Sequence, residues 1–244
     1  MPGSRKTEGI VLRSMRYGEA DRILHVFTPE HGRLSAIAKG VRKARSRFGG
    51  RLEPFFRLDL VLYEGRSDLL TVTSAETIAG YRHLREHGGA LDVAARAADA
   101  VDRMFDPGDP HPGVYHLLAN ELALLDADPP RHATTHNALA FRLKLLLAAG
   151  FTPQLAACAS CGEREHLTGF SGAAGGVVCP ACEANAFAFS QEAHDFLVAA
   201  LGSPLSAAPA APPRALHQAE RAILSTLEHH AHLRLRGVGA RSVP

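Results

Sequence analysis

The sequence predicts an α+β fold, with an N-terminal five-stranded β-barrel, a central and C-terminal α-helical domain, and a four-cysteine zinc-finger insert. Three observations predict it. Apolar and polar residues alternate through residues 7–80, helical spacing replaces this alternation from residue 81, and all four cysteines lie between residues 158 and 182. The chain has 244 residues, of which 46% are hydrophobic, so it can bury a core. The predicted domains are residues 1–80, residues 81–157 together with 183–244, and the insert 158–182.

Five β-prone runs are separated by turn residues in the first 80 positions. In the fourth run, Leu58, Leu60 and Leu62 alternate with Arg57 and Asp59. No helix long enough for a parallel crossover separates the runs, which favours a small closed barrel of the oligonucleotide/oligosaccharide-binding (OB) type. The runs are 9–13, 21–28, 33–39, 55–63 and 69–79.

Helical patterns occupy most of the remaining chain. In the third of these patterns, Leu139, Leu143, Leu146 and Leu147 are predicted to share one apolar stripe, and Gly150 to end the helix. The expected helices are 90–105, 114–125, 133–149, 190–201 and one that starts near 212–213.

The cysteines form two Cys-x2-Cys pairs, Cys158 with Cys161 and Cys179 with Cys182, separated by 17 residues. This spacing is typical of a zinc site, because each pair can present two thiolates and two pairs complete a tetrahedral shell. Four thiolates leave no open position, so one structural Zn²⁺ is predicted. The alternatives are two redox-active pairs or disulfides.

Positive charge is concentrated near the N-terminus. Residues 1–51 contain twelve Lys and Arg against four Asp and Glu, whereas the whole chain has a net charge of +2. The stretch 39–51 contains six cations, three glycines and no anion. It predicts a flexible arm that binds nucleic-acid phosphates without reading sequence, although a solvated surface loop is the alternative. The predicted DNA-binding residues are Lys39, Arg42, Lys43, Arg45, Arg47 and Arg51.

Aromatic rings near this stretch are candidates for stacking on the bases of a single strand. Tyr17 lies close to the first turn of the predicted barrel, and Phe48 lies inside the basic stretch itself. Both are predicted as stacking residues. Each could instead pack against its own strand or loop.

Two groups of short segments are informative when taken together. The N-terminal group comprises residues 9–12 (GIVL), 17–21 (YGEAD), 38–42 (AKGVR) and 52–55 (LEPF). The second comprises 141–146 (FRLKLL) and 150–153 (GFTP), followed by the first cysteine pair. In these segments the chain resembles the RecO family of bacterial recombination mediators. The resemblance covers most of the chain, and the parts follow the same order.

The resemblance implies an OB barrel, a helical domain and a zinc-binding insert. It also implies binding of single- and double-stranded DNA, annealing of complementary strands, and partnership with RecR. Further partners would be single-stranded-DNA-binding protein and, indirectly, RecA. DNA contact is transferred by the resemblance to Lys39, Arg42, Lys43 and Arg45.

No motif of an enzyme was found. Walker A, His-Glu-x-x-His and Gly-x-Ser-x-Gly sequences are absent, so a protein without catalytic residues or a small-molecule substrate is expected. The alternatives are a metal-dependent nuclease, a redox protein that uses the cysteine pairs, and an adaptor whose barrel binds protein. No apolar run approaches the ~20 residues of a membrane span, and the N-terminus lacks the pattern of a signal peptide. A cytoplasmic, nucleoid-associated protein is therefore expected.

Overall fold

A computed structural model describes residues 3–43, 46–65 and 69–238 of the chain. The chain forms two compact units, Met1–Pro129 and Pro130–Pro244. The first unit contains the barrel followed by three helices, so it extends beyond residue 80, where the sequence changes from strand to helix pattern. The second unit contains the remaining long helices and the cysteine segment.

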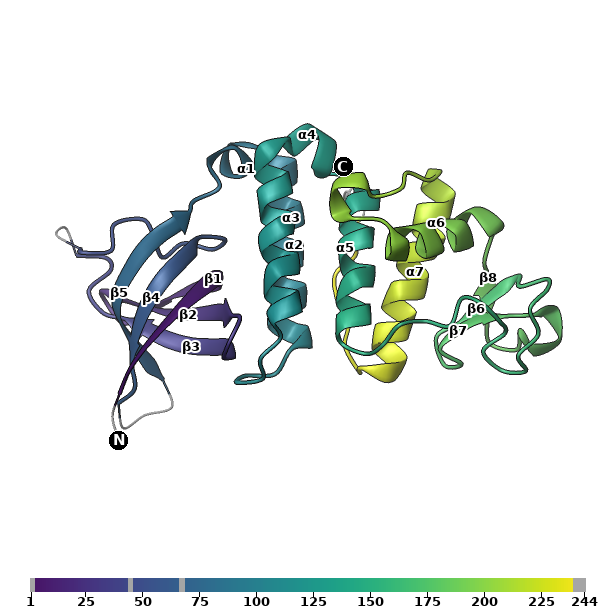
Figure 1. Ribbon diagram of the computed structural model, residues 1–244, viewed down its shortest axis with the longest axis horizontal. Helices are drawn as coiled ribbons and strands as arrows, with labels where there is room; N and C mark the ends of the chain where they lie inside the picture. Colours follow the sequence, from purple (N-terminus) through teal and green to yellow (C-terminus); the bar gives the residue numbers. More distant parts are fainter. Residues whose placement is uncertain (1–2, 44–45, 66–68, 239–244) are drawn as a thin grey trace. The chain divides into compact units, whose positions relative to one another are not determined.

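The five predicted strands are present and close into a barrel (Figure 1). Around the barrel their order is β1-β2-β3-β5-β4. All neighbouring pairs are antiparallel except β3 and β5, whose parallel pairing closes the ring. The strands are β1 (Ser4–Tyr17), β2 (Asp21–Thr28), β3 (Gly32–Ala38), β4 (Arg57–Tyr63) and β5 (Leu70–Ala79).

Strand β1 changes partner along its length, which allows five strands to form a closed ring. Its first half pairs with β4 and its second half with β2, and the register shifts between Val11 and Arg13. Gly9 lies where the two halves meet. A Cβ atom at this position would lie only 2.3 Å from the Val26 side chain, so the close approach of β1 and β2 requires glycine.

The barrel core is made by the inward-facing residues that the alternation predicts. Leu58, Leu60 and Leu62 of β4 are all fully buried, as are Leu24 and Val26 of β2. Arg57 and Asp59, which alternate with them, are only partly buried. The predicted face of β4 is therefore confirmed.

Three helices complete the first unit and pack beside the barrel (Figure 1). They are α1 (Arg82–Glu86), α2 (Gly88–Met104) and α3 (Pro112–Ala127). Asp102 near the end of α2 is almost fully buried and accepts hydrogen bonds from His25 Nδ1 at 2.8 Å and Arg33 Nη1 at 3.1 Å. Since both donors belong to barrel strands, this carboxylate holds α2 against the outer face of β2 and β3.

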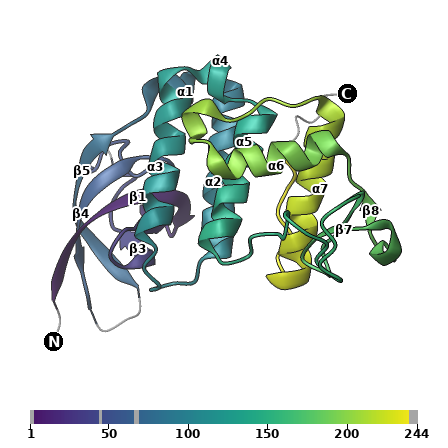
Figure 2. The same ribbon diagram turned by 45° about the vertical axis from the view of Figure 1, so that its right-hand side comes forward.

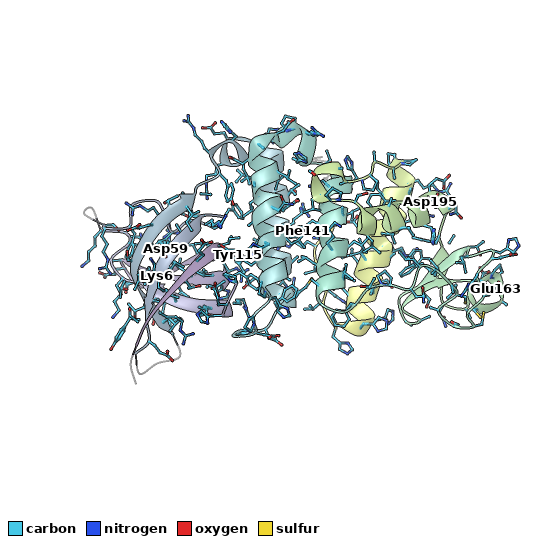
Figure 3. The ribbon with its side chains drawn as sticks, in the orientation of Figure 1. Lys6, Asp59, Tyr115, Phe141, Glu163 and Asp195 are labelled. Carbon is cyan, nitrogen blue, oxygen red and sulfur yellow. The ribbon has the colours of Figure 1, made fainter. Side chains whose placement is uncertain are left out.

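A second polar network links α3 to strands β1 and β4 of the barrel, and its tyrosine, Tyr115, is labelled in Figure 3. The Tyr115 hydroxyl donates to Glu8 Oε2 at 3.0 Å, and Arg57 Nη2 donates to the same oxygen at 2.7 Å. Burial raises the pKa of Tyr115 far above 10.0, so its hydroxyl keeps its proton. The hydrogen bond from Arg57 lowers the pKa of Glu8 below 4.5.

Replacing Tyr115 by phenylalanine is expected to lower the free energy of unfolding by about 1 kcal/mol, because a part-buried hydrogen bond to a carboxylate is lost. Since the pKa of Glu8 is depressed, the contribution of the network is present above about pH 4.5 and is lost as acid protonates Glu8. Urea unfolding at pH 7 and pH 3 measures both effects. Tyr63→Phe is the matched control, because Tyr63 is 43% exposed. Equal stability of Y115F and the unchanged protein at pH 7 would contradict this role.

The second unit is built on three packed helices, α5 (Thr135–Ala148), α6 (Gln191–Gly202) and α7 (Pro213–His230), shown in Figure 2. The Thr134 side chain caps α5 by accepting from the amide of Asn137, and Ser190 caps α6 through the amide of Ala193. A short helix, α4 (Pro129–His132), precedes α5, and a single turn, η2 (Leu205–Ala207), follows α6.

The apolar stripe predicted for α5 is confirmed at three of its four positions. Leu139, Leu143 and Leu146 are fully buried, whereas Leu147 is 51% exposed. Leu147 is about 80° around the helix from Leu139, at the edge of the stripe, so the core does not extend to it.

The cysteine segment contains a small sheet that the sequence did not predict. Its strands are β6 (Gly169–Ser171), β7 (Gly176–Val178) and β8 (Phe187–Ala188), in the order β7-β6-β8. Phe170 is fully buried, and its ring centroid lies 5.7 Å from that of Phe187 and 5.3 Å from that of Phe189. The segment therefore has an aromatic core beside its cysteines.

In the part of the chain that the structure describes, no helix has both the length and the apolar character that a membrane span needs.

Candidate metal centre and nucleic-acid interface

Two tight turns position the four cysteines. In the first, the Gly162 amide donates to Cys158 O at 2.9 Å, and Gly162 has a φ of 83°, a left-handed conformation that favours glycine. In the second, the Cys182 amide donates to Cys179 O at 2.9 Å across a 3₁₀ turn that begins at Pro180. The Ala159 amide also donates to Val177 O at 2.8 Å, which joins the first turn to β7.

The turns bring all four sulfur atoms to one point. Every pair of Sγ atoms is within 4.8 Å, and Cys161 Sγ lies 3.7 Å from Cys179 Sγ. Tetrahedral thiolates at about 2.3 Å from a zinc ion lie ~3.8 Å apart, so the cluster fits such an ion. The sulfurs are too far apart for disulfide bonds, which measure about 2.05 Å, and the four cysteines are free.

The charge distribution of the cluster also suits a cation. Amide groups, above all that of Cys179 and then those of Cys161 and Ser160, donate to the Cys158 sulfur and lower the pKa of Cys158 to about 6. The hydrogen bond with Cys161, followed by burial and the other thiols, raises the pKa of Cys182 to about 12. A divalent cation would favour the thiolate form of all four groups. The four sulfurs thus form one cluster that could hold a metal ion, rather than two separate pairs.

The basic stretch, residues 39–51, lies between β3 and β4 in the chain, and we call it the basic loop. Five of its six predicted DNA-binding cations are exposed, and Arg45 lies outside the described residues. The exposed cations are Lys39, Arg42, Lys43, Arg47 and Arg51. Lys39, Arg42 and Lys43 form no ion pair with another described residue, and all three are exposed to solvent.

The start of the basic loop is bonded to the turn between β1 and β2. The Gly40 amide donates to Asp21 Oδ1 at 2.8 Å, and the Arg42 amide donates to Ala20 O at 3.0 Å. Tyr17, at the end of β1, pairs with Asp21 in the same turn and is 54% exposed. The structure therefore brings the predicted stacking residue Tyr17 to the same end of the barrel as the first cations of the loop.

The second half of the loop is held to the barrel rather than free. Arg51 Nη1 donates to Ala75 O at 3.0 Å, and Arg47 Nη2 donates to Val72 O at 3.4 Å. These contacts to β5 restrict the arm that was expected to be flexible throughout. Each guanidinium keeps further donors for a phosphate, since arginine has five N–H groups.

Phe48 corrects the prediction of a second stacking residue. Its side chain is 1% exposed and belongs to the barrel core together with Leu52. The Arg47 guanidinium lies 4.8 Å from the centre of the Phe48 ring. A ring enclosed in this way has no face to offer a base, and Phe48 instead anchors the loop on the barrel.

Met15, which was not predicted as a surface residue of interest, is 36% exposed and lies two positions before Tyr17 on β1. The register places Met15 opposite Ile23, and Ile23 opposite Ile37. Their neighbours Leu24, in β2, and Ala36 and Ala38, in β3, face the core, so Met15, Ile23 and Ile37 form an outward apolar row across three strands. Side chains two positions apart on a strand face the same way, so the position of Met15 two residues before Tyr17 could have revealed this row.

Replacing Phe48 and Tyr17 separately by leucine tests this reassignment. We expect Phe48→Leu to lower the free energy of unfolding by about 1 kcal/mol through imperfect packing, with DNA affinity unchanged. Tyr17→Leu should leave stability unchanged and weaken single-strand binding by about 1–3 kcal/mol, the typical value of one stacking platform. Thermal unfolding and fluorescence anisotropy measure the two effects. The reverse pattern would restore Phe48 as the stacking residue.

A closed barrel with an exposed cationic loop is followed by helices and a four-cysteine cluster, and two family models match the chain in this order. Residues 1–81 match the family model "Recombination protein O N terminal", and residues 85–237 match "Recombination protein O C terminal". The two matches meet where the strand pattern gives way to helices.

Individual relatives agree with the family models. The chain is 39% identical over 239 residues to the DNA repair protein RecO of Anaeromyxobacter sp. (strain K), covering 94% of this chain and 92% of the relative. It is 41% identical over 183 residues to that of Rubrobacter xylanophilus, with 74% and 72% covered, and 39% identical over 178 residues to that of Bifidobacterium longum, with 72% and 73% covered. The chain belongs to the RecO family of DNA repair proteins.

Proposed function

We propose that this protein is a DNA repair and recombination mediator that binds single- and double-stranded DNA and anneals complementary strands. With RecR, it would help to load RecA onto strands coated by single-stranded-DNA-binding protein. The observation that carries the proposal is the row of unneutralised cations in the basic loop, next to an exposed tyrosine at one end of the barrel. Membership of the RecO family supports it.

The geometry supports annealing without covalent chemistry. Two complementary strands repel each other through their phosphates, and a shared cationic surface reduces this repulsion by releasing counterions. Lys39, Arg42 and Lys43 are exposed, so they can contact a backbone from the outside of the barrel. Because lysine and arginine contacts to phosphate carry no sequence information, any pair of complementary strands would be accepted.

We also propose that the metal is one structural Zn²⁺. Cysteine sulfur is its preferred ligand type in closed structural sites, and the spacing of the sulfurs suits its bond lengths. An iron–sulfur cluster uses the same four-cysteine ligand set. Elemental analysis and the visible absorption spectrum of the purified protein distinguish them, because only the iron–sulfur protein is coloured.

The experiment that tests the proposed function measures annealing of two complementary fluorescent strands, with and without added Mg²⁺. We expect annealing to be accelerated in both conditions and both strands to remain intact. Mg²⁺-dependent cleavage would instead establish the nuclease alternative. Binding of protein partners without affinity for oligonucleotides would establish the adaptor.

We propose that the protein is located in the bacterial cytoplasm, in association with the nucleoid. This follows from the proposed DNA substrate, and the curated relatives named above are all bacterial proteins. Fluorescence microscopy of a tagged chain in living cells would show signal over the nucleoid.

A further inference from the structure

The apolar row (Met15, Ile23 and Ile37) lies on the outer face of the barrel, away from its core. Met15 is 36% exposed, and Ile23 and Ile37 are partly exposed. Adjacent strands are about 4.8 Å apart, so the row spans ~10 Å across β1, β2 and β3. Single apolar side chains at a surface are ordinary, but these three lie in register on neighbouring strands and form one continuous apolar surface.

The row has a different neighbour on each side. On one side are Arg13 and His25, the next outward residues of β1 and β2. Arg13 Nη1 lies 3.9 Å from Asp102 Oδ2, and His25 Nδ1 lies 2.8 Å from Asp102 Oδ1. On the other side the next outward residue of β1 is Tyr17, which is 54% exposed. The row is therefore bounded by α2 on one side and continues into the candidate stacking residue on the other.

Positive charge borders the end of the row that carries Tyr17. Lys39 directly follows β3, and the bond from the Gly40 amide to Asp21 fixes the start of the basic loop beside this end of β1. Within the described part of the chain, the exposed side chains of Lys39, Arg42 and Lys43 form no ion pair. An apolar surface bordered by such cations complements a nucleic-acid strand, which has apolar base faces and a phosphate backbone.

The spacing of the side chains selects the form of the nucleic acid. Met15 and Tyr17 are two positions apart on one strand, so their side chains stand about 7 Å apart on the same face. Successive bases in a duplex strand are stacked about 3.4 Å apart, and their faces are covered by their neighbours. A strand with unstacked bases can place one base on each side chain, whereas a duplex can offer this surface only its backbone.

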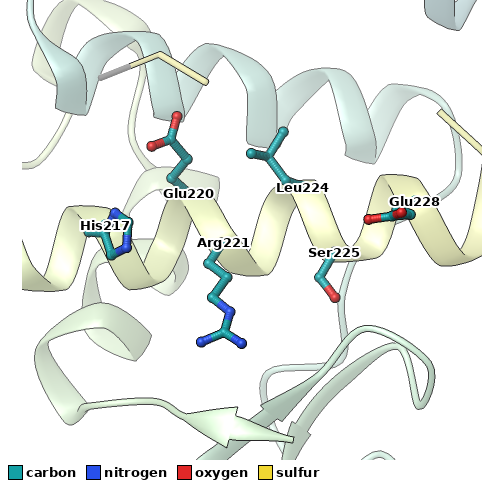
Figure 4. Close-up of a pocket in the computed structure, with 6 residues that line it drawn as sticks. All are labelled: His217, Glu220, Arg221, Leu224, Ser225 and Glu228. Atoms are coloured by element: carbon teal, nitrogen blue, oxygen red, sulfur yellow. The ribbon is translucent and has the colours of Figure 1, made fainter. Parts of the chain in front are cut away.

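A pocket of about 410 Å³ along α7 provides a contrast (Figure 4). Its lining carries charge of both signs, with Glu220 and Glu228 beside Arg221. Glu220 accepts a hydrogen bond from the Val238 amide, and Glu228 pairs with Arg234. Because its charges are mixed and partly neutralised within the protein, this pocket does not complement a polyanion.

We propose that the apolar row, together with Tyr17, is the part of the DNA site that distinguishes single strands from duplexes. This inference rests on the proposed function. The cations of the basic loop contact the phosphates of both forms, and the row contacts bases only where they are unpaired. Because every base has an apolar face, this contact selects the unpaired state without reading sequence. A newly annealed duplex loses the contact and is therefore released more readily than the separate strands.

Fluorescence anisotropy with a single strand and with a hairpin duplex tests the inference in the full-length protein. Met15→Thr should weaken binding of the single strand about tenfold, because apolar contact with a base is lost. Binding of the duplex should be unchanged. Threonine suits a strand, and thermal unfolding checks that M15T remains folded. Ile78→Thr is the matched control, because Ile78 is 43% exposed on β5, outside the row.

A single strand of the same length whose nucleotides lack bases gives a second measurement that needs only the unchanged protein. It carries the same phosphates, so the loop cations still bind it, but its affinity should be at least about tenfold lower than that of the ordinary strand.

Three results would overturn the inference: equal loss of single-strand and duplex binding in M15T, equal single-strand binding by M15T and I78T, or equal binding of the ordinary and base-free strands. Each of them leaves the proposed function standing, because the unchanged protein still binds DNA. Failure of the unchanged protein to bind either form of DNA would refute the proposed function and this inference together.

Discussion

Replacing Cys158 by serine is expected to weaken zinc binding strongly and to disorder both cysteine turns. Cys158 is 3% exposed and packs with Val178 and Cys179 in a small core formed around the sulfurs. Zinc binding to a structural site contributes about 10–16 kcal/mol, and this free energy is coupled to local folding. Loss of one thiolate would leave three ligands and an open position on the metal.

The rest of the insert should respond differently. Strand β6 packs against α7, and the Arg221 guanidinium lies over the Phe187 ring, so the small sheet has contacts that do not depend on the metal. We expect limited proteolysis of C158S to cut within residues 156–168 and 179–186 before it cuts the sheet. The barrel and the long helices should stay folded, so the far-ultraviolet circular dichroism spectrum of C158S should match that of the unchanged protein.

Elemental analysis should find one zinc per chain in the unchanged protein and much less in C158S. Ser160→Ala is the matched control, because Ser160 lies in the same turn, is exposed and contributes no sulfur ligand. Unaltered protease protection of the cysteine turns in C158S would contradict the account. So would a purified protein that folds fully without any metal.

Neutralising the basic loop is expected to change the salt dependence of DNA binding. If six phosphates are contacted on a single strand, the slope of log affinity against log salt is about −4, at ~0.7 for each phosphate. Changing Lys39, Arg42, Lys43 and Arg45 together to alanine should reduce the slope to about −1.4. At 0.1 M salt the affinity should then fall several hundredfold.

A control that removes four exposed arginines elsewhere separates the loop from total charge. Arg82, Arg103, Arg164 and Arg214 are exposed and lie outside the basic loop. Their combined replacement by alanine should leave the slope near −4. Similar slopes for the two fourfold variants would show that the loop has no special role.

The parts of this structure that could be predicted from sequence are those encoded by local pattern. The alternation around Leu58 and Leu60 identifies the buried face of β4, and the Cys-x2-Cys spacing predicts that the four cysteines cluster, because residues a few positions apart determine each geometry. The strand β1 was predicted as residues 9–13 but extends over Ser4–Tyr17. Charged residues such as Lys6 and Arg16 near its ends point outward and conceal the strand pattern.

The parts that could not be predicted depend on contacts between distant residues. Phe48 was predicted to stack on bases because it lies among cations, but the closed barrel places it in the core. Asp102 meets His25 across 77 positions of sequence, so the packing of α2 against the barrel left no local signal. Strand β8 has only two residues and forms because β6 lies beside it.

The proposed function requires the basic loop to bind the phosphate backbone without reading its bases. The most direct test measures the affinity of the unchanged protein for two single strands of unrelated sequence at several salt concentrations. We predict equal affinities and a common slope near −4. Failure to bind either strand at low salt, or binding that salt does not weaken, would contradict the proposed function.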